Sequence, residues 1–314
     1  MLRIAIQRLI MAIPILFGVT VIVFLLVNVL PGDPAAAILG DNATPAARVQ
    51  IAHQLGLDQP LPMRYLHWLG QILSGNLGYS PYRQRPVADL LTQAVGNTLA
   101  LATASALVGL LGGVVLGFIA GRRRGTLADR VISILGLSGL SVPSFFLAVV
   151  LLMIFSANLR WFPAAGTGLD VSFVAFFPHV VLPLIAGSLT TLAITTRVTR
   201  ASIVETEGSD FVLTLQAKGL ARRQISRHVL KNAISPVLTT SGLQVGYLLG
   251  GSILIETIFS WPGVGMLVYN AITTRDLIVV QGATLVVALT FVVVNLIVDL
   301  LQATIDPRLR RAVQ

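Results

Sequence analysis

The sequence is short of charge and contains no cysteine. Only 11% of its 314 residues are Asp, Glu, Lys or Arg, whereas a soluble globular chain has about 25%. Hydrophobic residues make up 55% of the chain. The absence of cysteine excludes disulfides, iron–sulfur clusters and thiolate metal sites. The shortage of charge argues against a soluble fold and indicates a membrane protein.

Several catalytic and ligand-binding motifs are also missing. The only lysines are Lys218 and Lys231, and neither lies in a Gly-x-x-x-x-Gly-Lys-Ser/Thr loop, so the chain has no P-loop for ATP. The four histidines are far apart in sequence and have no carboxylate or cysteine at metal-ligand spacing. A Gly-x-Ser-x-Gly nucleophile motif is absent as well. We therefore expect no enzyme, no metal site and no cofactor bound by this chain.

Six long apolar runs are present. A membrane-spanning helix needs roughly 20 mostly apolar residues, because it crosses about 30 Å of hydrocarbon and must pair all its backbone groups internally. The runs cover residues 9–30, 98–120, 131–157, 177–196, 236–259 and 279–303. The first has 22 residues, against roughly 7–15 in a cleaved signal, so we interpret it as a retained span. The sequence predicts an all-α polytopic membrane protein with six transmembrane helices.

Lysine and arginine are unequally divided between the two sides that six spans would create. Sixteen lie in the termini and in the loops after the second and fourth runs, and six lie in the other loops. Cytoplasmic loops carry the excess of positive charge in membrane proteins, so we expect both termini to be cytoplasmic. The same rule accounts for the net charge of +9 without a nucleic-acid partner.

The runs and loops divide the chain into four parts. We expect an N-terminal helix at residues 1–30, an external segment at 31–96, the main transmembrane domain at 97–304 and a cytoplasmic tail at 305–314. The external segment is long enough to form a small cap. Apolar residues at helical spacing between Tyr65 and Leu73 predict an amphipathic helix there, which either lies at the outer interface or packs on the spans.

Small and kinking residues lie inside the predicted spans. Gly113, Gly117 and Gly121 are four apart, a spacing typical of close helix packing, with a pore-lining role as the alternative. Pro143 should kink the third run or open its backbone. Ionisable side chains are nearly absent from the span centres, and Glu256 lies near the outer end of the fifth run. An ion-coupled carrier usually needs intramembrane charges, so we expect the energy for transport to come from a partner.

The loop between the fourth and fifth runs is the most informative segment. Leu213, Ala217 and Leu220 recur at helical spacing, and Gly219 is a natural helix stop. These residues predict a short helix parallel to the membrane that docks into a groove on a soluble protein. Binding of anionic lipid through the basic residues of the loop is the alternative.

Several motifs in order resemble the type I ABC-transporter permeases, and most closely the dipeptide/oligopeptide/nickel branch. They are DFVLTLQAKGL at Asp210–Leu220, RHVLKNAISP at Arg227–Pro236, LPGDPA at Leu30–Ala35, GLSVPSFFLA at Gly139–Ala148 and IETIFSWPGVG at Ile255–Gly265. Leu215 and Gln216 depart from the usual pattern of the branch. The resemblance extends over nearly the whole chain.

The resemblance implies a type I ABC importer permease fold for residues 97–304, with a small external cap between the first two helices and a coupling loop at 201–235. It assigns ATPase coupling to Asp210, Phe211, Thr214, Ala217, Lys218, Gly219 and Asn232. Candidate gate or path residues are Pro143, Ser144, Glu256, Pro262 and Gly263, for which packing is the alternative role.

The same resemblance implies partners, cargo and location. The partners would be a second, related permease subunit, two cytoplasmic ABC ATPases that bind ATP and Mg, an extracytoplasmic substrate-binding protein and membrane lipid. The cargo would be di- or oligopeptides or similar small solutes, with nickel complexes, glutathione, opines and oligosaccharides still open. The chain would be a multi-pass protein of the bacterial or archaeal cytoplasmic membrane. The alternative function is an ion-coupled secondary carrier.

Overall fold

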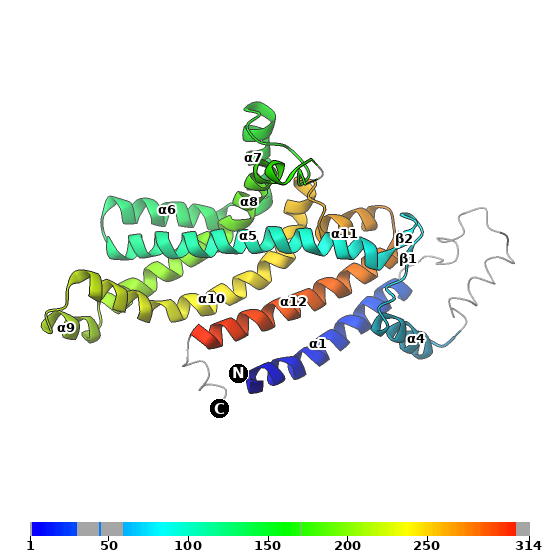
Figure 1. Ribbon diagram of the computed structural model, residues 1–314, viewed down its shortest axis with the longest axis horizontal. Helices are drawn as coiled ribbons and strands as arrows, with labels where there is room; N and C mark the ends of the chain where they lie inside the picture. The colour runs from blue at the N-terminus through cyan, green and yellow to red at the C-terminus, as the bar shows by residue number, and fades with distance from the viewer. Residues whose placement is uncertain (1, 30–43, 45–58, 170, 306–314) are drawn as a thin grey trace.

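The computed structural model describes residues 2–29, 44, 59–169 and 171–305, and these residues are mostly helical (Figure 1). Much of the predicted external segment, including the whole LPGDPA motif, and nearly all of the C-terminal tail lie outside the described residues. The predicted all-α class is confirmed. A short antiparallel pair, β1 (Tyr79–Ser80) and β2 (Arg85–Pro86), is the one exception among the described residues.

Four helices are long and apolar enough to cross a membrane: α1 (Leu2–Val29), α5 (Val87–Arg122), α8 (Phe173–Glu207) and α12 (Leu277–Ile305). α10 (Arg222–Ile258) contains the fifth apolar run, but polar residues such as Gln244 and Glu256 interrupt it, and it is less apolar than these four. α11 (Val264–Thr273) is a shorter apolar helix. The count of six spans therefore stays a prediction.

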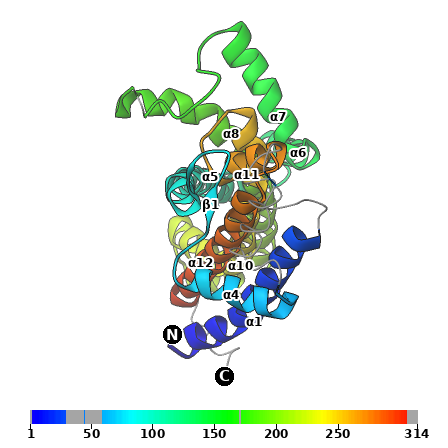
Figure 2. The ribbon, with the colours of Figure 1, turned by 90° about the vertical axis from the view of Figure 1, so that its right-hand side faces the viewer.

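The third predicted span is broken rather than straight. α6 (Leu127–Ser141) and the segment formed by α7 (Ser144–Leu151) and the π-helix η1 (Leu152–Asn158) make an angle of 101°. Proline disfavours helical geometry in the residue before it, and Val142 is extended, with φ −89° and ψ 118°. The kink or open backbone expected at Pro143 is therefore observed as a full break of the helix, and a single span over residues 131–157 stays a prediction. α7 projects from the bundle (Figures 1 and 2).

The glycines of α5 pack directly against α8. A Cβ atom at Gly113 would lie 2.5 Å from Thr195 Cβ, and one at Gly121 would lie 2.7 Å from Ile203 Cβ. Gly109 makes the same kind of approach to Thr191. These contacts confirm the packing interpretation of the glycine spacing, because the glycines face a neighbouring helix rather than an open path.

The described part of the segment predicted to be external is fixed to α1 and α12. α4 (Leu61–Leu73) lies against α1, where the rings of Tyr65 and Trp68 are 5.4 Å and 5.5 Å from that of Phe24. Ser80 in β1 is buried and donates to Asp276, whose Oδ1 accepts from the backbone N–H of Val279 at the start of α12. Of the two predicted positions for the amphipathic helix, packing on a span is therefore the one observed.

Candidate functional site

The helix α9 (Asp210–Ala217) forms one end of the molecule, between α8 and α10 (Figure 1). Its predicted stop is observed: Gly219 has φ +73°, a left-handed conformation that glycine adopts without steric strain. Val212 is the only buried residue of α9, and it belongs to a cluster with Ile203, Val229 and Ala233. Leu215 of α9 is half-buried and packs against the same cluster, so these two apolar side chains anchor α9 to α8 and α10. The predicted coupling loop at 201–235 is mostly helical, because α8 and α10 extend into it.

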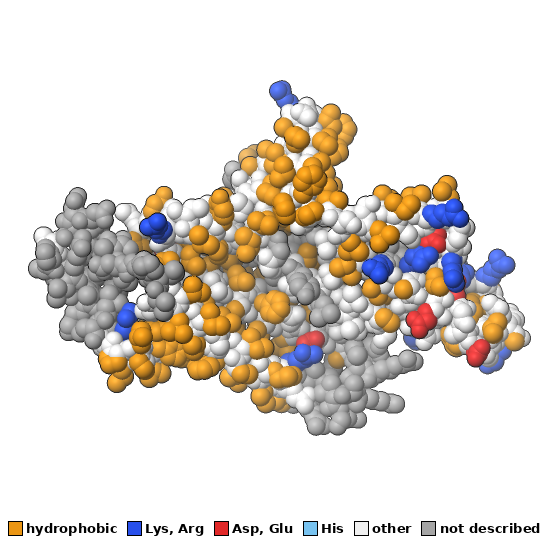
Figure 3. Space-filling model, turned by 180° about the vertical axis from the view of Figure 1, so that it is seen from behind, with side chains coloured by type: hydrophobic (Ala, Val, Ile, Leu, Met, Phe, Trp, Pro, Cys, Tyr) orange, Lys and Arg blue, Asp and Glu red, His pale blue; other side chains and the backbone are white. Residues whose placement is uncertain are grey.

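Apart from Val212 and the half-buried Leu215, the residues of α9 are exposed. Phe211 is 40% exposed and Leu213 is 59% exposed. The predicted coupling residues Thr214, Ala217 and Lys218 are also exposed. Charged side chains gather at this end of the molecule, as Figure 3 shows. Exposed apolar side chains on a helix at a charged end of the molecule are suited to docking another protein.

The predicted coupling residues lie on two elements. Asp210, Phe211, Thr214 and Ala217 lie on α9, and Lys218 and Gly219 directly follow it. Asn232 lies on α10 instead, where its amide donates to the His228 carbonyl at 3.0 Å. The His228 ring is 6.4 Å from the Phe211 ring, so His228 contacts α9 directly. Asn232 lies one helical turn further along α10.

An ion pair between a buried carboxylate and a half-buried arginine supports the same end of the molecule. Asp129, which is 4% exposed, accepts from Arg200 Nε at 2.5 Å and Nη2 at 2.9 Å. It also accepts from the backbone N–H of Gly125 at 2.9 Å. Such two-point guanidinium–carboxylate contacts are strong and fix orientation. The pair joins the start of α6 to α8 shortly before α8 leads into α9.

A cavity of about 160 Å³, with a mostly apolar wall, lies among α5, α7, α8 and α10. Its lining residues are Leu101, Ala102, Ser105, Ser144, Gly187, Thr190, Thr191, Gln244, Leu248, Ser252 and Ile255. Ser144 is a predicted path residue, and the break at Pro143 places it here as the first residue of α7. Among the described residues, the lining has several hydroxyl groups and one amide but no charged side chain.

The inner part of this cavity is buried, and its rim is accessible. Ser105, Gln244 and Ser252 are 2%, 8% and 6% exposed. Thr190 is exposed and Ser144 half-buried, so they form the rim. The Ser105 hydroxyl is buried and has no hydrogen-bond partner among the described residues.

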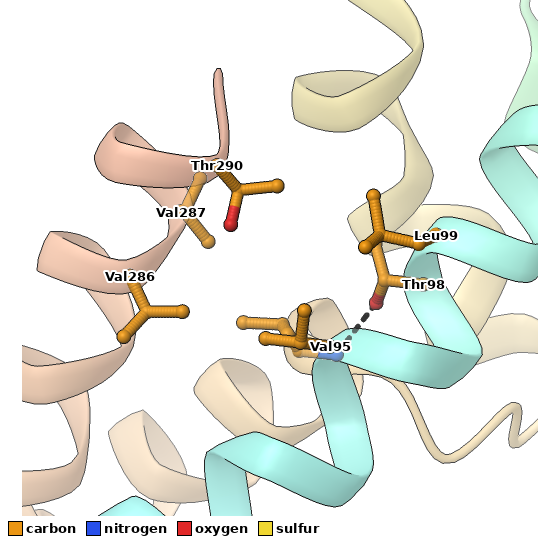
Figure 4. Close-up of a pocket in the computed structure, with 7 residues that line it drawn as sticks. Val95, Thr98, Leu99, Val286, Val287 and Thr290 are labelled. Carbon is orange, nitrogen blue, oxygen red and sulfur yellow. Dashed lines mark hydrogen bonds between the residues drawn. The ribbon is translucent and has the colours of Figure 1, made fainter. Parts of the chain in front are cut away.

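A second cavity lies between α5, α11 and α12, and Figure 4 shows its walls of valine and leucine. Its volume is about 20 Å³, which is room for roughly one water molecule. The Thr98 hydroxyl accepts from the backbone N–H of Val264 at 2.8 Å, the dashed line in Figure 4. This cavity is too small for a cargo.

Glu256 is fully buried and holds the start of α11. Its carboxylate accepts from the Thr98 hydroxyl at 2.8 Å and from the backbone N–H groups of Gly265 at 2.7 Å and Met266 at 3.3 Å. Unpaired N–H groups and a positive partial charge at a helix N-terminus favour a carboxylate there. A Cβ atom at Gly263 would collide with this carboxylate. Glu256 thus caps α11 and ties α10 to α5.

Two more hydrogen bonds fix the segment between α10 and α11. The Asn97 amide donates to the Pro262 carbonyl at 2.9 Å, and the indole N–H of Trp261 donates to the Asn97 carbonyl at 3.0 Å. The structure therefore brings the predicted gate residues Glu256, Pro262 and Gly263 into one network. Ser144 instead lines the cavity of about 160 Å³, and Pro143 directly precedes it.

Replacing Glu256 with glutamine is expected to lower the free energy of unfolding by about 1–3 kcal/mol, the penalty for a buried donor left without its acceptor. The glutamine amide nitrogen would replace one carboxylate oxygen. This nitrogen donates hydrogen bonds, whereas the oxygen now accepts them. Thermal unfolding in detergent measures the effect. Glu205→Gln on the exposed surface of α8 is the matched control, with a change of about 0.5 kcal/mol or less. Equal stability of the two variants would contradict the capping role.

Comparison with known proteins covers almost the whole chain. Residues 113–311 match the family described as binding-protein-dependent transport system inner membrane component, and residues 1–102 match the corresponding N-terminal family. A peptide permease protein of Brucella suis biovar 1 (strain 1330) is 39% identical over 317 residues, with 99% of each chain covered. The glutathione transport system permease protein of Escherichia coli (strain K12) is 39% identical over 311 residues, again with 99% of each covered.

A solved structure is similar in fold. The MetNI methionine ABC transporter in an inward-facing conformation contains a chain that matches with a TM-score of 0.51 and 18% sequence identity. The match covers 72% of the present chain and 96% of the other chain. At this identity the likeness shows a common fold and nothing about cargo.

Proposed function

Because this chain belongs to the family of binding-protein-dependent transport system inner membrane components, we propose that it forms the path for di- or oligopeptides through a membrane and is driven through α9. It is a multi-pass permease subunit of an ABC importer and not an enzyme. Its family implies ATPase and substrate-binding partners. What we propose is the identity of the cargo, the contact through which α9 couples to an ATPase, and the composition of the assembly.

The exposure of apolar side chains on α9 is the observation that carries the coupling proposal. Phe211 and Leu213 expose apolar surface beside the exposed Lys218, and Val212 anchors the helix from beneath. In our proposal, Asp210, Phe211, Thr214, Ala217, Lys218, Gly219 and Asn232 form the contact with a cytoplasmic ATPase. ATP and Mg bind to the two ATPases, and this chain binds no cofactor.

Movement of a docked α9 would reach the bundle by two routes. α8 continues from the Thr195–Gly113 contact to within two residues of α9, and Arg200 on α8 holds Asp129 at the start of α6. A rigid ion pair transmits displacement better than a flexible loop, because its two charged hydrogen bonds fix both distance and orientation. A docked ATPase would therefore move α8 and α6 together.

The cargo proposal is supported by the names of the relatives. One is a peptide permease protein and another a glutathione transport system permease. The cavity among α5, α7, α8 and α10 is lined by apolar side chains with a few hydroxyl groups and one amide, which suits an uncharged part of such a solute. We place Ser144 on the path and Pro143 at its hinge. Glu256, Pro262 and Gly263 form the gate in this proposal, moving as one body because of their shared network.

The assembly we propose contains a second, related permease subunit, an extracytoplasmic binding protein and surrounding lipid. The segment formed by α7 and η1 exposes Phe145 (46%), Phe146 (56%) and Met153 (53%), and Trp161 (64%) lies shortly beyond it. This projecting apolar surface supports contact with that second subunit. Both termini are cytoplasmic in the proposal, and the membrane is the cytoplasmic membrane of a bacterium or archaeon.

Reconstitution tests the proposed function directly. The chain is purified with its candidate second permease and ATPases, placed in liposomes and supplied with the binding protein and a labelled tripeptide. We expect peptide uptake that requires ATP, and ATP hydrolysis that rises with peptide. Uptake that persists without ATP and stops when an ionophore removes the ion gradient would overturn the proposal in favour of a secondary carrier.

A further inference from the structure

We propose that α4 is an interfacial helix that contacts the acyl chains of phospholipid, in the membrane leaflet where α1 ends at Val29. The segment that contains α4 is predicted to be external. The claim therefore places part of the predicted cap inside the membrane boundary rather than above it. It depends only on the membrane location of the chain, and not on the cargo, the energy source or the partner subunits.

α4 has two apolar faces, and only one of them packs on α1. Tyr65 and Trp68 form the packed face, through their ring contacts with Phe24. The second face, called the free face below, has side chains that are 61%, 63% and 79% exposed: Met63, Leu66 and Leu73. Spacings of three and seven positions place these three on one side of the helix. Gly70 lies between them, and a Cβ atom there would meet no neighbouring element within 4 Å.

A polar strip runs along another side of α4. Arg64, His67 and Gln71 are three and four positions apart, so they share one side of the helix. The His67 and Gln71 side chains hydrogen-bond at 3.1 Å, and Arg64 donates to Asn28 near the end of α1. Leucine and tryptophan on one surface with arginine on the other are typical of helices that lie in the plane of a membrane interface. The polar strip is the side of α4 that suits water.

The contacts with α1 place α4 at the boundary of the hydrocarbon. The apolar stretch of α1 that suits a membrane span covers Ala5–Leu26. The Tyr65 hydroxyl reaches into this stretch and hydrogen-bonds the Thr20 hydroxyl at 2.8 Å. Thr20 is six positions before Leu26, roughly 9 Å along the helix axis. Interfacial helices bury their apolar face about 5–10 Å into the boundary between headgroups and acyl chains, so the depth of α4 fits this class.

The surface of α1 beside α4 identifies lipid as the occupant of the free face. Phe17, Ile13 and Ile10 continue the α1 face of Thr20 toward the N-terminus, and they are 57%, 66% and 59% exposed. On a spanning helix, such side chains meet acyl chains. The Phe17 and Tyr65 rings are 6.3 Å apart, so the apolar surfaces of the two helices adjoin. Figure 3 shows hydrophobic side chains gathered where α1 and α4 lie.

Contact of α4 with lipid would hold the described part of the cap at two points. One is α4 itself, at the membrane boundary. The other is the hydrogen bond from the buried Ser80 to Asp276 at the start of α12. The short β1–β2 hairpin between these points would then stay close to the membrane surface.

A fluorescent probe on the free face tests the proposal, because the chain has no cysteine of its own. Leu66→Cys carries the small probe NBD, and the full chain is placed in phosphatidylcholine nanodiscs, with and without its candidate partner subunits. We expect emission at shorter wavelength, loss of fluorescence to lipid with a nitroxide near the glycerol end of its acyl chain, and little loss to aqueous iodide. Gln71→Cys on the polar strip is the matched control. Its probe should lose fluorescence to iodide and little to the nitroxide lipid.

A measurement on the unmodified chain covers the case in which the cysteine variants do not fold. A phospholipid with a diazirine near the glycerol end of its acyl chain is photolysed in the same nanodiscs, and the modified residues are located by mass spectrometry. We expect adducts on the free face, at Met63, Leu66 or Leu73. The polar strip at His67 and Gln71 should remain unmodified.

Three results would overturn the inference. Equal quenching by iodide at Leu66→Cys and Gln71→Cys would place the free face in water. Protection of the Leu66→Cys probe from both quenchers, or loss of its lipid quenching when the second permease or the binding protein is added, would show that a protein surface covers the face. Adducts on Ile10 and Ile13 of α1 without any on the free face would show that lipid reaches α1 but not α4.

Discussion

Replacing Gly117 with alanine is expected to leave little correctly folded protein. The new Cβ atom would lie 2.5 Å from the backbone oxygen of Thr196 and 2.6 Å from Thr199 Cβ. A rotamer change cannot relieve contact with a backbone atom, so α5 and α8 would have to move apart. Overpacking of this kind costs about 1–3 kcal/mol and occasionally more. Close approach at small residues is also a main source of association between membrane helices.

The same substitution elsewhere on α5 provides the control. A Cβ atom at Gly96 would meet no neighbouring helix or side chain within 4 Å, and alanine is about 1 kcal/mol more favourable than glycine in a helix. Gly96→Ala should therefore match or exceed the original thermal stability. Yield of monodisperse protein in detergent and the midpoint of thermal unfolding measure both variants. Similar losses of yield and thermal stability in Gly117→Ala and Gly96→Ala would show that the contact of Gly117 with α8 is not required for folding.

The effect of Gly117→Ala should also reach α9. α8 carries the residues that face the α5 glycines, and the same helix holds Arg200 and then leads to α9. Loss of the α5–α8 contact removes the fixed support on which the Asp129–Arg200 pair depends. In any Gly117→Ala protein that is recovered, ATP hydrolysis should no longer respond to peptide.

Elements with a local cause could be predicted from the sequence. The stop of α9 follows from Gly219 alone, because glycine tolerates the left-handed conformation found there. The break near Pro143 follows from proline chemistry. Its angle of 101° does not, since the direction of α7 depends on its packing against helices elsewhere in the sequence. The glycine spacing predicted packing, but not that α8 would be the partner.

The candidate site was less predictable, because its contacts join distant parts of the chain. Glu256 and Thr98 are 158 positions apart, and nothing near Glu256 in the sequence indicates that it caps α11. The cavity combines residues from four helices, so no local pattern could indicate it. Two sequence signals for contacts between helices were present, however. Thr191, Thr195 and Thr199 repeat every four residues on α8, which indicates one packed helix face, and Asp129 follows Arg122–Arg124 in a basic loop, which indicates an ion pair.

Replacing Leu213 with aspartate is expected to prevent coupling to the ATPases. Leu213 is 59% exposed on α9, a large exposure for an apolar side chain that the proposal places against a partner. Loss of an anchor at the centre of an interface costs about 2 kcal/mol or more, which is roughly 30-fold in affinity. The new carboxylate would also lose hydration if it were buried in that interface. We expect the ATPases to separate from the permease during purification, and ATP-driven peptide uptake to be lost.

Leu127→Asp is the matched control for this prediction. Leu127 is also an exposed leucine, at 76%, and it begins α6 near the same end of the molecule. Its position in the first helical turn favours an acidic residue, so the folded chain should tolerate the change and retain its ATPases. The dissociation constant is measured in detergent, which separates protein docking from lipid binding by the basic residues around α9. If Leu213→Asp binds the ATPases as tightly as Leu127→Asp does, the exposed side of α9 around Leu213 is not the docking surface. Contact with membrane lipid then accounts for the exposure of Leu213.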